Sequence, residues 1–240
     1  MSGDAPGGLG IGSLISATLR LAGDGFGRMF PAALGVSLVS ALAAEGLAPA
    51  DPVPALGPGL LWAALADLLL GTLLTGFLCL VAIDVAIGRR HSTGQYLRQA
   101  VRQFLPLLVF TLAVSIAIGI GIVFLVIPGL YAAARYLPYC ATTVFEDAGW
   151  RGIERAEVLT RGYRWPLVGL LAIGFALLLA VGIPIGVLSA EFGPLTGLAA
   201  QVALSALGYL VAAAFSAMVY LRLRDLREGV SASDLAASIG

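Results

Sequence analysis

The residues best placed to do chemistry in this chain are three charged side chains inside long apolar runs: Asp67, Asp84 and Arg135. If these runs cross a membrane, each charge costs at least ~2.5–3.5 kcal/mol near mid-bilayer and usually has a partner. Counted from the expected turns, Asp67 and Arg135 differ in depth by only about 3 Å, at about 1.5 Å per residue. We therefore predict an intramembrane Asp67–Arg135 pair, either a structural clamp or part of a polar path for a proton, an ion or a headgroup.

Other candidate residues are few. Asp84 lies near the end of its apolar run, where it can pair with a following arginine or with one from another part of the chain, and Glu146 is a second such acid. His91 is the only histidine, which removes most metal sites and catalytic triads. Cys79 and Cys140 have no C-x-x-C partner and are interpreted as small core residues. We expect no catalytic residue, no metal, no cofactor and no enzymatic activity.

The arginines indicate which elements must position these residues. The chain has 14 basic residues, all of them arginine, and all but Arg135 fall in the clusters 20–28, 89–102, 151–164 and 222–227. The mostly apolar gaps between clusters are about 60, 48 and 57 residues long, and a span needs roughly 20 apolar residues. Each gap therefore holds two spans. The predicted fold is an all-α, polytopic membrane bundle of six transmembrane helices, at about 30–48, 59–87, 104–127, 129–146, 166–189 and 195–221.

Composition and charge place this bundle in a membrane. Hydrophobic residues make up 59% of the chain and charged residues only 12%, against about 25% in an average soluble domain. Arginines in short loops favour the cytoplasmic side, so both termini are predicted to be cytoplasmic, and nucleic acid is not an expected partner. The exclusive use of arginine, with abundant alanine and glycine, favours a bacterial protein, so we expect the inner (plasma) membrane.

An internal repeat is predicted within this single membrane domain, 1–240. Its units cover about 9–88, 92–146 and 149–221, and 222–240 is a cytoplasmic tail. Each unit has a short amphipathic segment, then an arginine, an aromatic residue and a proline (Pro31, Pro106 or Pro166), then two spans. Proline suits the first turn of a helix, where its missing N–H is no loss. The amphipathic segments are expected to be interfacial helices, with cytoplasmic extensions of the following spans as the alternative.

The turns between spans follow from proline and glycine. We expect an extended outer loop at 48–54, a tight turn at 127–129 and a third turn at 191–194. Small residues recur every four positions in the third span, at Ala113, Ala117 and Gly121. Such spacing lets two membrane helices approach closely.

Five arginines next to the spans are candidate contacts of lipid phosphates, because arginine at the cytoplasmic interface can reach them. They are Arg28, Arg98, Arg102, Arg161 and Arg164. Membrane lipids are the expected partners. Neither protein partners nor the oligomeric state follow from the sequence.

The segment 127–165 resembles a known family. It contains Ile-Pro-Gly at 127–129, Arg135, Glu146 and then Arg155, Leu159, Thr160, Gly162 and Trp165. In these features the chain resembles six-span proteins related to the membrane domain of glycerophosphodiester phosphodiesterases, and the uncharacterised YciC-like inner-membrane proteins. Ala156 stands where that family has a serine. The resemblance implies a membrane domain alone, without the soluble catalytic barrel.

Two functions of different classes remain open at this point. One is a non-enzymatic inner-membrane protein that organises or senses lipid, favoured by the repeat, the arginine clusters and the lack of catalytic side chains. The other is a small transporter or channel with a polar path near Asp67 and Arg135. A membrane-embedded enzyme acting on lipid is the least favoured, because it needs a nucleophile with a base, or a metal site.

Overall fold

The computed structural model describes residues 10–47, 58–89, 91–124, 126–192 and 194–230, and within these ranges it contains helices and turns but no strand. The predicted outer loop at 48–54 and the end of the predicted tail, 231–240, lie outside the described residues. The elements in chain order are α1 (Ile11–Leu47), α2 (Pro58–Ala86), α3 (Thr93–Arg102), α4 (Phe104–Phe124), α5 (Val126–Tyr136), the π-helix η1 (Ala141–Phe145), the 3₁₀-helix η2 (Gly149–Arg151), α6 (Gly152–Thr160), α7 (Arg164–Phe192) and α8 (Pro194–Glu228).

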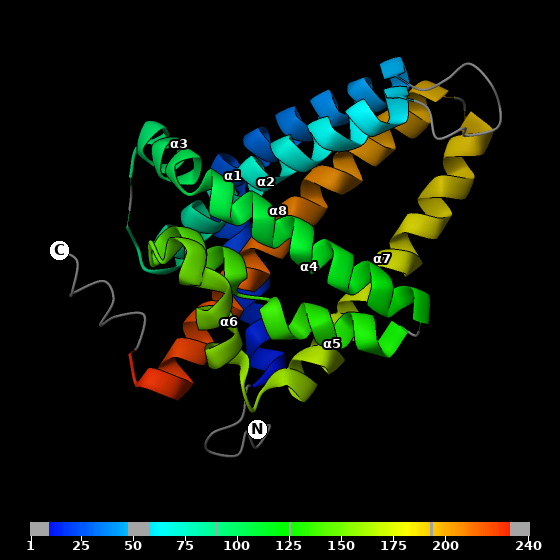
Figure 1. Ribbon diagram of the computed structural model, residues 1–240. Helices are drawn as coiled ribbons and strands as arrows, with labels where there is room; N and C mark the ends of the chain where they lie inside the picture. Colours follow the sequence, from blue (N-terminus) through cyan, green and yellow to red (C-terminus); the bar gives the residue numbers. More distant parts are fainter. Residues whose placement is uncertain (1–9, 48–57, 90, 125, 193, 231–240) are drawn as a thin grey trace.

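Five described helices, α1, α2, α4, α7 and α8, are long and apolar enough to cross a membrane. The chain is therefore an all-α protein of the multi-pass membrane type. The end of α1 and the start of α2 lie at one end of the molecule, with the end of α7 and the start of α8 (Figure 1). The start of α1 and the end of α8 lie at the opposite end. α8 extends to Glu228, so the predicted tail is helical over its first residues.

The protein core lies where α1, α2 and α8 pack on one another. Met29 of α1, Leu78 and Ile83 of α2 and Tyr220 of α8 are completely buried there. Buried alanines of α8, at 206, 213, 214 and 217, leave room for the neighbouring helices. Small residues have this role in membrane bundles because van der Waals packing, rather than escape from water, holds the helices together.

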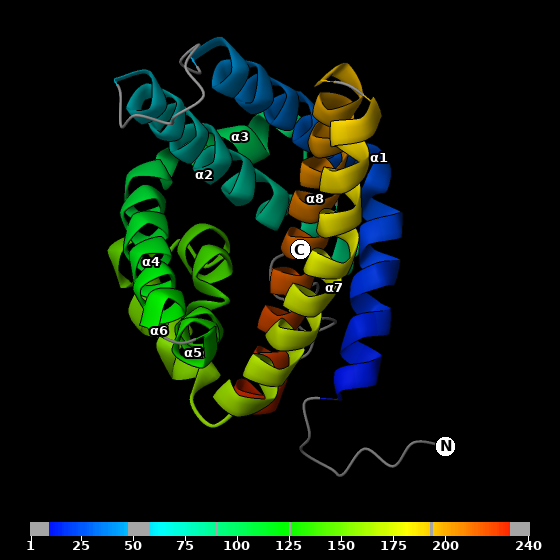
Figure 2. The ribbon, with the colours of Figure 1, turned by 90° about the vertical axis from the view of Figure 1, so that its right-hand side faces the viewer.

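A second group of helices, α4, α5 and α6, lies on the other side of the molecule from α1, α7 and α8 (Figure 2). α4 and α5 form a tight hairpin. A Cβ atom placed on Gly121 would lie 2.5 Å from the backbone nitrogen of Gly129, so the close approach predicted from the small residues of the third span is found at Gly121, whereas Ala113 is exposed. The predicted turn residues 127–129 belong to the first turn of α5 instead.

The predicted fourth span, 129–146, is not one continuous α-helix. α5 ends at Tyr136, and η1 follows after a turn at Leu137 and Pro138. Proline explains this break, because it lacks an N–H and its ring disfavours helical geometry in the preceding residue. At about 1.5 Å per residue, α5 alone is too short for a hydrocarbon core of about 30 Å.

The three predicted amphipathic segments differ in structure. α3 and α6 are separate short helices, as predicted for an interfacial element, and Ser92 and Gln95 form a reciprocal capping box at the start of α3. The first segment is instead the beginning of the continuous helix α1, which is the alternative reading. Pro106 and Pro166 occupy the first turns of α4 and α7, whereas Pro31 lies inside α1, so the first-turn prediction is wrong for Pro31.

Candidate functional site

Arg135 has a partner other than the predicted one. Its Nη2 lies 2.7 Å from Oε1 of Glu157 in α6, and Thr160 of α6 donates a hydrogen bond to the Arg135 carbonyl oxygen at 2.8 Å. This hydrogen-bonded pair lowers the pKa of Glu157, chiefly through the hydrogen bond from Arg135. The predicted Asp67–Arg135 pair is therefore wrong. The short helix α6 folds back against α5 and brings Glu157 closer than any acid of the spans.

Asp67 lies on the outside of α2 and is exposed in the protein. It has no ion pair or hydrogen bond among the described residues. One turn further along α2, a Cβ on Gly71 would lie 3.1 Å from the hydroxyl of Tyr209 in α8, so this face of α2 meets Tyr209. Asp67 and Arg135 therefore have different surroundings, because Asp67 is exposed on α2 and Arg135 is held by Glu157 of α6.

Asp84 forms a compact polar cluster that the sequence did not reveal. Its Oδ2 pairs with Nδ1 of His91 and accepts a hydrogen bond from the Tyr96 hydroxyl at 2.9 Å. The same hydroxyl accepts a hydrogen bond from the backbone N–H of His91 at 3.1 Å. Gly88, with φ of +75°, lets the chain turn back after α2. The sequence signal for this cluster was the position of His91, three residues after Gly88 at the end of a span and seven positions after Asp84.

Glu146, the second predicted polar residue, joins η1 to α6 and α8. Nε of Arg155 donates to its Oε2 at 2.9 Å, and the Tyr220 hydroxyl donates to its Oε1 at 2.8 Å. Arg224 donates to the Tyr220 hydroxyl at 2.8 Å, and Glu228 pairs with both Arg155 and Arg224. The carboxylate is well satisfied, so its role here is to hold three elements together.

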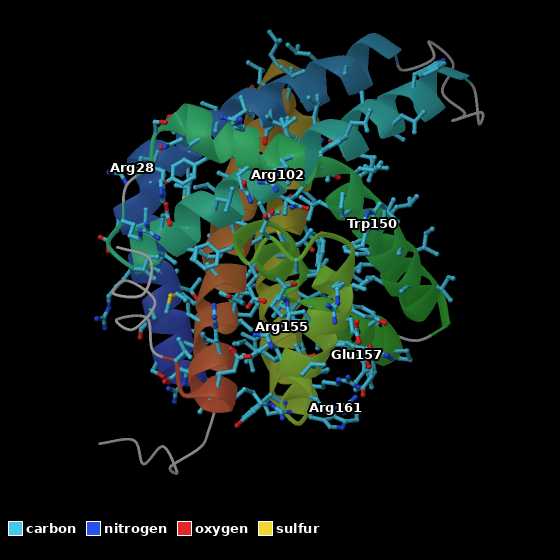
Figure 3. All side chains as sticks on the ribbon, turned by 60° about the vertical axis from the view of Figure 1, so that its left-hand side comes forward. Arg28, Arg102, Trp150, Arg155, Glu157 and Arg161 are labelled. Carbon is cyan, nitrogen blue, oxygen red and sulfur yellow. The ribbon has the colours of Figure 1, made fainter. Side chains whose placement is uncertain are left out.

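The five predicted phosphate contacts separate into two kinds. Arg28, Arg98 and Arg161 are exposed, and in the described part of the chain none has a carboxylate within 4 Å. Arg102 is 69% exposed, with Asp147 3.6 Å away. Arg164 is only 18% exposed and binds Glu157 and the Tyr131 hydroxyl, so it is a structural residue. Figure 3 shows Arg28, Arg102 and Arg161 spread over the side of the molecule that α1, α3 and α6 form.

Two cavities lie next to these polar groups. One, of about 340 Å³, is lined by Glu146 and by residues of η2 and α6. The other, of about 300 Å³, contains Asp84 and His91. Neither is lined by Asp67 or Arg135. No group of His, Cys, Asp and Glu side chains within the described ranges has the arrangement of a metal site.

Several residues of the segment 127–165 are brought together by this arrangement. Glu146 binds Arg155, Thr160 binds the backbone of Arg135, and Gly162 has a φ of +91° that only glycine adopts easily. Comparison of the chain with family models, with characterised proteins and with solved structures gave no match.

Proposed function

We propose that this protein is a non-enzymatic protein of the bacterial inner membrane that binds and organises anionic lipids at its cytoplasmic face. The proposal includes six spans, cytoplasmic termini and membership of the family that the segment 127–165 resembles. In it, α5 and η1 together form the discontinuous fourth span. The threefold repeat is also part of the proposal, with its first interfacial helix fused to the following span in α1.

The observation that carries this proposal is the difference between the two kinds of arginine. Arg135, Arg155 and Arg164 are bound by acids of the protein. Arg28, Arg98 and Arg161 are exposed and have no carboxylate within 4 Å in the described residues. Basic residues beside spans attract anionic lipid by about 1 kcal/mol each.

Aromatic side chains support the same location. Trp165 is 68% exposed and Trp150 is 57% exposed. Trp150 lies in η2, and Trp165 is the second residue of α7, four positions after Arg161 in the sequence. Tryptophan prefers the membrane–water interface, where its ring is in apolar surroundings and its N–H remains wet.

The test is lipid selectivity in vesicles that contain brominated phosphatidylglycerol, which quenches tryptophan fluorescence. Substitution of Arg28, Arg98 and Arg161 by Gln should weaken the preference for phosphatidylglycerol over phosphatidylcholine by roughly 100-fold, from about 1 kcal/mol per charge. The matched control replaces the same three residues by Lys and should retain most of the preference. An unchanged preference in the Gln variant contradicts the proposal.

A small transporter is the second candidate, and one observation favours it. The helix is interrupted between α5 and η1. Thr142 and Thr143 of η1 are fully buried. The Thr143 hydroxyl has no hydrogen-bond partner in the described residues. Discontinuous helices form substrate sites in transporters, and π-helical turns occur often at functional sites. Solute flux into proteoliposomes that is lost in Thr143→Val, with the fold intact, would favour this function.

A further inference from the structure

The cavity between the end of α2, α3 and η1 combines an acid and a base in one small space. Its lining includes Asp84, Arg89, His91, Gln95 and Gln99. Its volume of about 300 Å³ corresponds to roughly ten water molecules at about 30 Å³ each. A small zwitterionic group fits this volume and this lining.

The carboxylate of Asp84 is the most unusual group in the cavity. Asp84 is only 3% exposed, and a buried carboxylate needs compensation by donors or a positive charge. His91 and Tyr96 both bind the same oxygen, Oδ2. Oδ1 accepts no hydrogen bond from the described residues, so one carboxylate oxygen remains available for a donor in the cavity.

The positive side of the cavity is formed by Arg89, which lies just after the turn that ends α2. Gln99 donates to the Val144 carbonyl oxygen at 3.3 Å and so joins α3 to η1 as a wall of the cavity. An anion bound near Arg89 and a cation bound at Asp84 would belong to one small molecule.

The position of the cavity along α2 indicates the source of such a molecule. Asp84 is two residues before the end of α2 at Ala86, a rise of about 3 Å. The end of a membrane-spanning helix lies at the level of the lipid headgroups. A phosphoethanolamine group has a primary ammonium with three N–H donors and a phosphate, so one such group offers a cation to Asp84 and an anion to Arg89, which both line the cavity.

We propose that this cavity binds a phosphoethanolamine group, with its ammonium on Oδ1 of Asp84 and its phosphate towards Arg89. This inference deepens the proposed lipid-binding function and rests on it, but it concerns a different lipid class and a different set of residues. The ligand is the headgroup of an aminophospholipid, or the same group in soluble form. A quaternary ammonium has no N–H donor, so the cavity discriminates against phosphocholine.

The first experiment uses the unmodified protein in detergent and native mass spectrometry. Phosphatidylethanolamine should bind about tenfold more tightly than phosphatidylcholine with the same acyl chains, as expected for one charge-assisted hydrogen bond. The mono- and dimethylated lipids should fall between them. Equal binding across the methylation series overturns the proposal, and no variant has to fold for this result.

Variants then place the site. Asp84→Asn should abolish the preference for phosphatidylethanolamine, whereas Asp67→Asn, which changes another acid of α2 that does not line the cavity, should retain it. Phosphatidylglycerol binding is measured on the same samples, so a loss there tests the proposed function separately. Competition by soluble phosphoethanolamine at the affinity of the lipid would identify the soluble group as the ligand, and competition only at much higher concentration would identify the lipid. A preference that survives Asp84→Asn overturns the assignment.

Discussion

α2 and α7 differ in what surrounds them, although they resemble each other in sequence. Each has 29 residues and is apolar over most of its length. In α2, 61% of the apolar segment is buried within the protein, whereas in α7 only 11% is buried. Hydrophobicity therefore indicates that both helices leave water, but it does not indicate whether protein or lipid replaces the water.

The tightest helix contact should be the most sensitive position in the molecule. Gly121→Val should destabilise the protein by about 3 kcal/mol or more, because the added atoms meet the backbone of Gly129, which cannot rotate away. The measurement is unfolding of the purified protein in mixed detergent. Gly119→Val is the matched control, since nothing lies within 4 Å of a Cβ at that position. Equal losses in the two variants would contradict a packed α4–α5 hairpin.

The contrast between α2 and α7 can be tested directly by replacing one leucine in each helix. Leu78 of α2 is completely buried and Leu177 of α7 is 61% exposed. Leu78→Ala should cost about 2 kcal/mol, near the low end for a buried leucine, since the gain from leaving water is small within a membrane. Leu177→Ala should change stability by less than about 0.5 kcal/mol. A large loss at Leu177 in detergent would mean that another protein surface covers α7.

Polar groups sharpen the same contrast. Arg135→Ala should reduce stability by roughly 1–2 kcal/mol, since it leaves Glu157 without its closest partner. Asp67→Ala should have no effect or should increase the folded yield, because Asp67 is exposed on an apolar helix. A double-mutant cycle should give coupling between Arg135 and Glu157 and additivity between Arg135 and Asp67. Coupling to Asp67 would restore the pair expected from the sequence.

Lowering the pH should produce the smallest of these changes in stability. The pKa of Glu157 in the folded protein is lowered below its ordinary 4.5, chiefly by the hydrogen bond from Arg135. The stability from this pair is therefore complete above about pH 4.5 and is lost as the pH falls through the lower, folded-state value. The expected loss is below about 1 kcal/mol, because the side chains are partly exposed. Glu157→Gln should lack this part of the pH dependence.

Much of the fold could be predicted from local pattern. Five of the six predicted spans correspond to long apolar helices, and the amphipathic segment predicted at the start of the second repeat unit is the separate short helix α3. The candidate site was predicted less well. Asp84 and Glu146 were identified as candidate polar residues, but neither His91 nor the network around Tyr220 was connected to them. Periodicity along one segment carries no information about which segments meet.

The sequence by itself determined that the protein is a helical membrane protein, because apolar length and the placement of arginine depend only on local composition. Tertiary structure decided the partners of the charges. Arg135 binds Glu157 because α6 folds back on α5, and Asp84 binds His91 because Gly88 reverses the chain. Tertiary structure also decided that α2 is packed and α7 exposed. The burial of a helix depends on the shapes of the helices that pack against it. Two apolar helices of equal length therefore differ in burial only after the chain has folded.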